Sequence, residues 1–471
     1  MANKALVWFR NDLRISDNPA LTAAIDRHDG VLAVYVHESM PGLRPAGAAA
    51  RWWLNRSLNQ LNVDLAGIGV PLRVVAGQTA QEIARLSAAE DVTAVYWNRR
   101  YGHAEREVDG GIMRDLRARG LTVESSNASL LVEPFDIATQ AGAPFAVFTP
   151  FWRALRSRAI PAPLPAPQPR HTPFKPASID GDYIAPPWTR KLAECNMPGA
   201  AAAERALFAF VDDDLARYAS TRDFPAERRT SLLSAHLRFG EIGPRQVWHA
   251  IRLAADRDPF LESSAEKFLS ELGWREFCYH LMYHRADISC VPMNSRFEGM
   301  SWRHDPDALS KWQRGMTGIP MVDAGMRELW ATGRMHNRVR MVVASFLTKN
   351  LLMDWRLGEQ WFWETLVDAD PASNPANWQW VAGCGADAAP YFRVFNPVLQ
   401  GERFDPEGRY VRQWVPELAD RPPARIHHPL EKSVLVTGSE QDKPERGYPG
   451  PLVDLKASRQ RALDAYAALR E

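Results

Sequence analysis

Hydrophobic and polar positions follow two alternating patterns over residues 1–130. Short apolar runs rich in Val, Leu and aromatic residues are "ALVWF" (5–9), "VLAVYV" (31–36), "PLRVVA" (71–76), "VTAVYW" (92–97) and "LTVESS" (121–126). Amphipathic stretches such as "ARWWLNRSLNQLNVDL" (50–65) lie between them. Strands that alternate with helices predict a parallel, doubly wound α/β sheet.

The turn after the first run is "RNDLRISDNPALTAA" (10–24). Asp17 or Asn18 can cap a helix that Pro19 opens at its first position. The stretch does not contain GxGxxG, so the fingerprint of dinucleotide-binding sheets is absent from this turn. The α/β pattern alone therefore does not predict NAD binding.

A chain of 471 residues is longer than one hydrophobic core supports, so several domains are expected. "AIPAPLPAPQPRHTPFKP" (159–176) repeats proline too often for a helix or a central strand. Beyond it, apolar residues recur at helical spacing, most clearly over 264–284 and 334–355. We predict an α/β domain (1–130), a proline-rich linker (131–200) and an all-helical domain (201–471).

Composition narrows the class of protein. Hydrophobic residues make up 46% and charged residues 24%, and no apolar run approaches the ~18 residues of a membrane span. "KALVWFR" is too short for an export signal and Arg10 interrupts it, so a cytoplasmic protein is expected. The cysteines show neither CxxC nor Cys/His ligand spacing, which predicts no disulfide framework and no metal site; they are Cys195, Cys278, Cys290 and Cys384.

Two predicted helices carry polar side chains inside apolar sequence. Glu271, Trp274 and Arg275 lie on one stripe of the first helix. An i,i+4 pair between Glu271 and Arg275 on a solvated face is the structural alternative. Asn337, Arg340 and Met341 share a face of the second helix, with His336 and Arg338 beside them. Buried polar groups need partners, so facing stripes would suit a large ligand rich in heteroatoms, such as a flavin or a nucleotide.

"DADPASNPANWQW" (368–380) ends a region with an excess of tryptophan, because eight lie between Trp302 and Trp380. Cores built only for packing prefer Leu, Ile, Val and Phe. Trp378 and Trp380 would share a face on a strand but point in nearly opposite directions on a helix. Indole rings can pass electrons, and aromatics beside arginines can stack on bases while the arginines hold phosphates. The net charge of +1 is compatible with nucleic-acid binding, since nearly equal numbers of acidic and basic residues can still leave one face of the protein basic.

Six segments along the chain form a distinctive combination: "VWFRNDLRISDNPAL", "WREF", "TGIPMVDAGMREL", "MHNRVRM", "NWQW" and "DAAPYFRVFNP". Together they resemble the DNA photolyase/cryptochrome family over nearly the whole chain. The resemblance is strongest to class I cyclobutane pyrimidine dimer photolyases. It implies an α/β domain with an antenna chromophore, a linker, and a helical domain that holds FAD.

The resemblance also implies individual roles in binding FAD. Asp368 would pair with Arg340 beside the flavin, Asp370 would lie near the ring, and Asn374 would face flavin N5. The wider set of cofactor-binding residues is Tyr218, Thr230, Ser231, Leu232, Leu233, Ser234, Phe268, Arg275, Asn337, Arg340, Asp368, Asp370 and Asn374. Phe268 stands where some members have tryptophan.

The DNA site implied by the resemblance places Glu271 on the dimer, Trp274 and Trp380 against its bases, and Asn337 and Met341 on the floor. Six-four photolyases carry a proton-donating histidine in place of Met341, and a thioether cannot take that role. Arg222, Arg338 and Arg393 resemble the phosphate clamps.

The family's electron-transfer chain corresponds to Trp378, Trp355 and Trp302, from the flavin to the surface. Trp312 lies in the same region, but its spacing to Trp355 does not match the family's distal position. Glu105 in "YWNRRYGHAEREVD" resembles the acid that contacts a folate antenna, whereas Ala104 departs from an asparagine found there. A methenyltetrahydrofolate or a deazaflavin is therefore expected as the second chromophore.

The activity implied is light-driven splitting of cyclobutane dimers in DNA, a carbon–carbon lyase reaction. Reduced FAD would donate one electron to the flipped dimer and regain it after the ring bonds split. We expect a monomer that acts on damaged DNA without a metal. A cryptochrome-type photoreceptor and a six-four photolyase are the alternatives.

Overall fold

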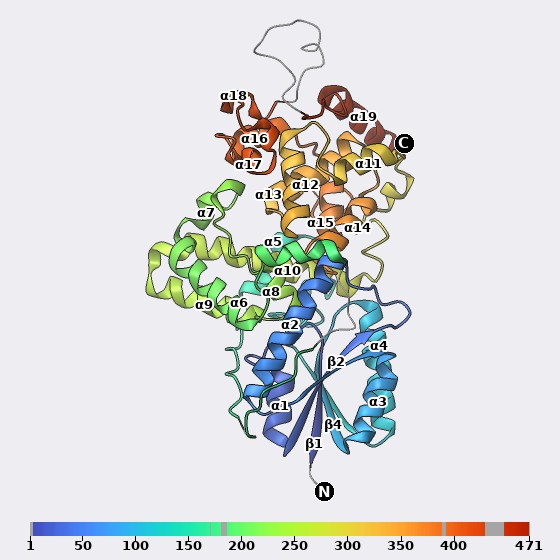
Figure 1. Cartoon of the computed structure of the whole chain (residues 1–471). Helices are drawn as coiled ribbons and strands as arrows, with labels where there is room; N and C mark the ends of the chain where they lie inside the picture. The colour runs from blue at the N-terminus through green and yellow to red at the C-terminus, as the bar shows by residue number, and fades with distance from the viewer. Residues whose placement is uncertain (1–2, 170, 180–185, 389–391, 429–446, 471) are drawn as a thin grey trace, which may run out of the picture. The chain divides into compact units, whose positions relative to one another are not determined.

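The computed structural model describes residues 3–169, 171–179, 186–388, 392–428 and 447–470 (Figure 1). Parts of the predicted linker, and residues 389–391 of "DAAPYFRVFNP", lie outside these ranges. The chain forms two compact units. Unit 1 comprises 1–190, 197–219 and 231–286, and unit 2 comprises 191–196, 220–230 and 287–471. This division by compactness does not follow the predicted domain boundaries, which stay a prediction.

Unit 1 contains the predicted sheet. Its five parallel strands lie in the order β3-β2-β1-β4-β5, and they are β1 (Lys4–Phe9), β2 (Gly30–Glu38), β3 (Leu72–Gly77), β4 (Val92–Asn98) and β5 (Thr122–Ser126). Both faces are covered, by α1 (Pro19–Arg27) and α2 (Ala48–Gly67) on one side and by α3 (Thr79–Ala89) and α4 (His103–Ala118) on the other (Figure 1). Because neither face meets water, the central strands are almost continuously apolar.

The first helix begins as the sequence predicts. Asn18 is the N-cap of α1, its side chain accepts a hydrogen bond from the Leu21 N–H at 3.1 Å, and Pro19 is the first helical residue. Asp17, the other candidate, has a φ of 48° and forms an ion pair with Arg245 at 2.7 Å. Asn18 therefore caps the helix, and Asp17 fixes the turn.

The other α-helices of five or more residues described in unit 1 include α10, which confirms the helix predicted over 264–284. They are α5 (Phe148–Arg156), α6 (Ala200–Ala209), α8 (Ser234–Phe239), α9 (Pro244–Arg257) and α10 (Glu262–His284). The short α7 (Tyr218–Thr221) contains the boundary between the units at residue 219.

Unit 2 is helical around a core rich in Met and Trp. Its helices are α11 (Pro306–Gln313), α12 (Pro320–Thr332), α13 (Asn337–Ser345), α14 (Trp355–Thr365), α15 (Ser373–Ala382), α16 (Pro397–Phe404), α17 (Arg409–Trp414), α18 (Pro423–Ile426) and α19 (Leu455–Ala467). Figure 1 shows α12, α13, α14 and α15 close together.

The single helix predicted over 334–355 is wrong. Helix α13 ends at Ser345, a π-helical turn η7 (Phe346–Asn350) follows, and Leu352 has a φ of 54°, which no α-helix accommodates. A new helix, α14, then begins after Asp354, whose side chain accepts the Arg356 N–H at 2.9 Å. The sequence pattern missed the break because the residues around it stay buried, including the polar Thr348, Lys349 and Asn350.

Within the described ranges, every helix is too short or too polar to cross a membrane.

Candidate cofactor and nucleic-acid site

The residues predicted from the sequence fall in both units. Unit 2 contains Arg222, Thr230, Trp302, Asn337, Arg338, Arg340, Met341, Trp355, Asp368, Asp370, Asn374, Trp378, Trp380 and Arg393. Unit 1 contains Glu105, Tyr218, Ser231, Leu232, Leu233, Ser234, Phe268, Glu271, Trp274 and Arg275.

Arg340 and Asp368 form the ion pair that the sequence predicts. One terminal nitrogen of the Arg340 guanidinium lies 3.0 and 2.8 Å from the two Asp368 carboxylate oxygens, and Arg340 Nε donates to the Met335 carbonyl at 2.8 Å. The Asp368 side chain is 6% exposed. A charge this buried needs its partner, so each residue fixes the other.

Asn374 is held by a residue that the sequence did not identify. Its Nδ2 donates to both the carbonyl oxygen and the carboxylate Oε1 of Glu359, at 3.0 and 2.9 Å. Both donors of the amide are therefore used, and what Asn374 can offer a ligand is the acceptor Oδ1. Asp370 is also placed by local bonds, because its Oδ1 accepts the N–H groups of Ala372 and Ser373 at the start of α15.

Trp378 lies in a cage of apolar side chains. It is 2% exposed, and its ring centroid lies 5.0 Å from that of Phe362 and 6.3 Å from that of Trp312. Gly358 makes room for the indole, since a Cβ at that position would lie 2.1 Å from Trp378 Cη2.

Gly358→Ala should therefore displace the Trp378 ring and lower the free energy of unfolding by about 1–3 kcal/mol through overpacking. Gly111→Ala is the control, because Gly111 also lies in a helix and a Cβ there would meet nothing within 4 Å. That variant should gain about 0.4–1 kcal/mol. Thermal melts and tryptophan fluorescence compare the two variants, and equal behaviour would show that Trp378 does not depend on Gly358.

The other two tryptophans of the predicted chain differ in exposure. Trp355 is 1% exposed at the start of α14, and Trp302 is half-buried. Trp312 is fully buried on α11 and its Nε1 donates to the Val343 carbonyl at 3.1 Å. The structure thus shows a contact that the sequence did not predict, between the rings of Trp312 and Trp378.

Trp380 has different neighbours from Trp378. Both lie on α15, so the helical alternative for "NWQW" is confirmed. The Trp380 indole is half-buried, and its Nε1 donates to the Asp387 carbonyl at 3.1 Å. Gln379 between them is fully buried and bonds to the Met293 N–H and the Ile288 carbonyl. The helix thus directs the two indoles to different surroundings.

The start of α13 gathers predicted DNA contacts. Asn337 is exposed there, and Arg338 forms an ion pair with Asp223 at 2.8 Å. Arg222 Nε lies 3.9 Å from the carboxylate of the same Asp223. His336 caps the helix by accepting the Arg338 N–H at 3.2 Å. Burial lowers the pKa of His336 to about 4, so the imidazole stays neutral and able to accept at neutral pH.

In the same part of unit 2, Met341 Sδ lies 4.0 Å from an Arg338 guanidinium nitrogen. Arg393 is exposed, beyond the end of α15 in the chain. Asp223 therefore joins Arg222 and Arg338, and Met341 lies beside Arg338.

In unit 1, one face of Trp274 is covered. Its ring stacks on Phe148 with centroids 3.8 Å apart, so a ligand could stack only on the other face. Glu271 pairs with Lys267 at 3.1 Å. Arg275 bonds to Glu276 at 3.2 Å and to the Ser129 carbonyl at 2.8 Å, and the alternative Glu271–Arg275 pair stays a prediction.

Glu276 should make stability depend on pH. Burial raises its pKa from 4.5 to about 7, although Arg275 and the Leu131 N–H favour the charged form. The folded chain thus holds this proton more tightly than the unfolded chain. The contribution of protonated Glu276 to the free energy of unfolding is complete below pH 4.5. It is lost as the pH rises to about 7, which lowers the free energy of unfolding by about 3 kcal/mol.

Thermal melts from pH 4.5 to 8 should show that wild type loses stability relative to Glu276→Gln as the pH rises. Glu107 is exposed, so the stability difference between wild type and Glu107→Gln should not change with pH. A constant difference between wild type and Glu276→Gln would contradict the raised pKa.

Further predicted cofactor residues form an aromatic cluster and a strained loop. The Tyr218 and Phe268 rings lie 5.3 Å apart, and both contact Phe210. In "TSLLS", Leu232 is 53% exposed with a φ of 55°, and Leu233 is right-handed. A left-handed residue beside a right-handed one is backbone geometry that can form an anion-binding concavity, which fits a phosphate. Such strain in a non-glycine residue is typical of functional sites.

Glu105 has a local structural partner. Its Oε2 accepts the Gly102 N–H at 3.1 Å as part of the capping box of α4. Its predicted contact with an antenna stays a prediction.

Sequence reasoning missed Gly358 and Glu359, which position Trp378 and Asn374. A glycine inside the aromatic helix "WRLGEQWFWET" was the available signal, since such a glycine usually has a packing reason. Across the described ranges, no group of three or more His, Cys, Asp or Glu side chains is placed to hold a metal ion.

Comparisons with known proteins agree with this architecture. Residues 5–169 match the family model described as DNA photolyase, and residues 268–468 match that of the FAD binding domain of DNA photolyase. A deoxyribodipyrimidine photo-lyase of Agrobacterium fabrum is 45% identical over 99% of this chain and 98% of its own. The chain belongs to the DNA photolyase family.

Solved structures of the family superimpose closely. A bacterial class III photolyase from Agrobacterium tumefaciens gives a TM-score of 0.92 at 44% identity, covering 100% of this chain and 98% of that one. An archaeal photolyase from Sulfolobus tokodaii, described with two FAD molecules, gives 0.81 at 29% identity, covering 99% and 100%. The fold prediction is thereby confirmed, whereas the expected class I assignment stays a prediction.

Proposed function

We propose that this protein binds FAD and uses light to split cyclobutane pyrimidine dimers in DNA. The observation that carries the proposal is the amide of Asn374, whose donors are both taken by Glu359. The remaining oxygen favours a flavin that carries a hydrogen on N5, because an acceptor pairs with N–H and not with a bare nitrogen. When bound and reduced, FAD supplies the electron that splits the dimer.

The chain's own residues divide the work of holding FAD. Arg340 and Asp368 form a rigid pair, and Asp370 fixes the start of α15, so that Asn374 keeps one orientation. The left-handed turn at Leu232 would receive phosphate, and Tyr218, Phe268 and Arg275 would complete the site from unit 1. Trp378, Trp355 and Trp302 would return electrons to the oxidised cofactor.

The lesion site would use groups that are open in each unit. Trp274 and Trp380 are half-buried, and Asn337 is exposed at the start of α13. Met341 offers a thioether and no proton, which favours cyclobutane dimers over six-four products. Glu271 would bond the dimer, and Arg222, Arg338 and Arg393 would hold its phosphates.

The finer predictions belong to the same proposal. Glu105 would contact a folate or a deazaflavin antenna, and the protein would act as a monomer in the cytoplasm. The three-part division at residues 130 and 200 would separate antenna domain, linker and catalytic domain.

Irradiation of the FAD-loaded protein with DNA that contains cyclobutane dimers tests the proposal. Chromatography should show monomers restored under blue light and none in the dark. A protein that reduces its flavin in light but leaves every dimer intact would be a photoreceptor of the cryptochrome type, and the proposal would fail.

A further inference from the structure

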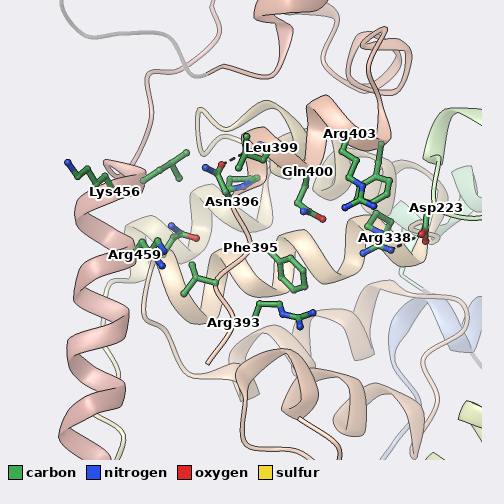
Figure 2. A pocket seen from close by; sticks show the side chains of 15 residues that line it. Asp223, Arg338, Arg393, Phe395, Asn396, Leu399, Gln400, Arg403, Lys456 and Arg459 are labelled. Carbon is green, nitrogen blue, oxygen red and sulfur yellow. Dashed lines mark hydrogen bonds and ion pairs between the residues drawn. The ribbon is translucent and has the colours of Figure 1, made fainter. Parts of the chain in front are cut away.

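A groove of about 780 Å³ in unit 2 lies beside the proposed lesion contacts (Figure 2). We call it the basic groove. It is lined by Asp223, Arg338, Asn350, Arg393, Val394, Phe395, Asn396, Pro397, Leu399, Gln400, Arg403, Phe404, Leu455, Lys456 and Arg459. They come from the segment after α7, from α13 and η7, from the segment before α16, and from α16 and α19. Its volume is within the range of about 300–1,000 Å³ that is usual for small-molecule sites.

The basic groove concentrates positive charge in a chain whose net charge is +1. Five of the described lining residues are cations and one, Asp223, is an acid. Asp223 is used by Arg338, and no described carboxylate forms an ion pair with Arg393, Arg403, Lys456 or Arg459. Figure 2 shows Arg338 and Arg403 at one end and Lys456 and Arg459 at the other. The charge therefore suits an extended anion better than a single compact one.

The middle of the groove offers a different chemistry. Phe395 is half-buried and, with Gln400, faces the space between the cationic ends (Figure 2). Two residues of the groove lining, Gln400 in the middle and Asn350 beside α19, have buried acceptors, Oε1 and Oδ1, for which no described residue is a donor, and Asn350 is only 2% exposed. Asn350 Nδ2 is already bonded to Ser458 Oγ at 2.9 Å. Unmatched buried acceptors call for N–H groups from a ligand, which a phosphate lacks and a base edge has.

We propose that the basic groove binds an unpaired stretch of DNA next to the dimer, with a base stacked on Phe395 and phosphates at the two cationic ends. A positive groove with an aromatic platform is the general arrangement of single-strand sites. Continuity with the proposed lesion face supports this occupant, because Arg338 and Arg393 line the groove as well. The inference rests on the proposed function, since it extends the DNA substrate beyond the dimer.

Two oligonucleotide lengths separate the groove from the lesion site. A short single strand carries the dimer with one nucleotide on either side, and a long one extends well beyond it. Lys456→Gln/Arg459→Gln should bind the short strand like wild type but lose affinity for the long one. For the long strand, the slope of log K against log salt measured with this variant should be smaller in magnitude by about 1.4 than with wild type, because each of the two lost phosphate contacts accounts for about 0.7. Lys311→Gln/Arg314→Gln removes equal charge outside the groove and should leave both slopes unchanged.

Abasic sites placed along the flank of the long strand locate the stacked base. Phe395→Leu keeps an apolar side chain and should weaken the long strand about tenfold. That loss should vanish when the stacked position is abasic. FAD content and repair of the short strand check that the variant is folded.

Three results decide the matter. Groove variants that bind long and short strands as wild type does would overturn the inference while leaving repair intact. A polyglutamate peptide that competes as well as an undamaged oligonucleotide of equal charge would also overturn it, in favour of an acidic protein partner. Failure of wild type to repair the short strand would instead remove the proposed function, whether or not the long strand is bound through the groove.

Discussion

Trp378→Phe should nearly abolish light-driven reduction of oxidised FAD while dimer repair by chemically pre-reduced protein survives. Phenylalanine is much harder to oxidise than indole, so the variant loses the first electron donor and keeps an aromatic ring in the cage formed by Gly358, Phe362 and Trp312. Repair does not use this donor once the cofactor is reduced. Flavin absorbance under illumination with an external reductant measures the first property, and product chromatography measures the second.

Trp380→Ala is the matched variant, two residues along α15. It should keep photoreduction and lose dimer affinity by about 1–3 kcal/mol if the indole stacks on a base. Both proteins are first assayed for bound FAD. Identical defects in the two variants would show that the pair acts as one packing unit, contrary to the different surroundings that the structure gives them.

Asp368→Asn should release FAD and destabilise unit 2. The substitution leaves the Arg340 guanidinium without its charged partner, and breaking a buried pair costs about 3–5 kcal/mol. Because Arg340 is 28% exposed, we expect solvent to reduce this to about 1–3 kcal/mol. The double variant Arg340→Gln/Asp368→Asn removes both charges and should recover most of the stability without recovering FAD.

Glu417→Gln provides the control for that cycle. Glu417 pairs with Arg327 at 2.7 Å in the same unit, with both side chains partly exposed. It should lose stability without losing FAD. If the Asp368 double variant regained FAD together with stability, the pair would be structural and would not hold the cofactor.

The sequence predicted most of the sheet because hydrophobic pattern and strand order act locally. Asn18 was one of two candidate caps, and the structure selects it through a bond to Leu21. The break near Leu352 was not predictable, since its cause is a backbone reversal within residues that remain buried on both sides of it. Periodicity reports which face is buried, not where the chain turns.

The candidate site was predictable where one side chain carries the chemistry, as for Arg340, Asp368 and Trp378. It was not predictable where a residue acts through another. Glu359 orients Asn374 from fifteen positions away, and Gly358 acts by lacking a side chain. The basic groove joins residues more than a hundred positions apart, so no local motif marks it.

The most direct measurement places a thymine cyclobutane dimer and a six-four product in separate DNA duplexes, with one FAD-loaded, fully reduced preparation of the protein. Both are irradiated with blue light, and the products are separated by chromatography. The account predicts light-dependent recovery of thymines from the cyclobutane dimer and an unchanged six-four product. Repair of the six-four product with no repair of the cyclobutane dimer would contradict both the proposed substrate and the role given to Met341.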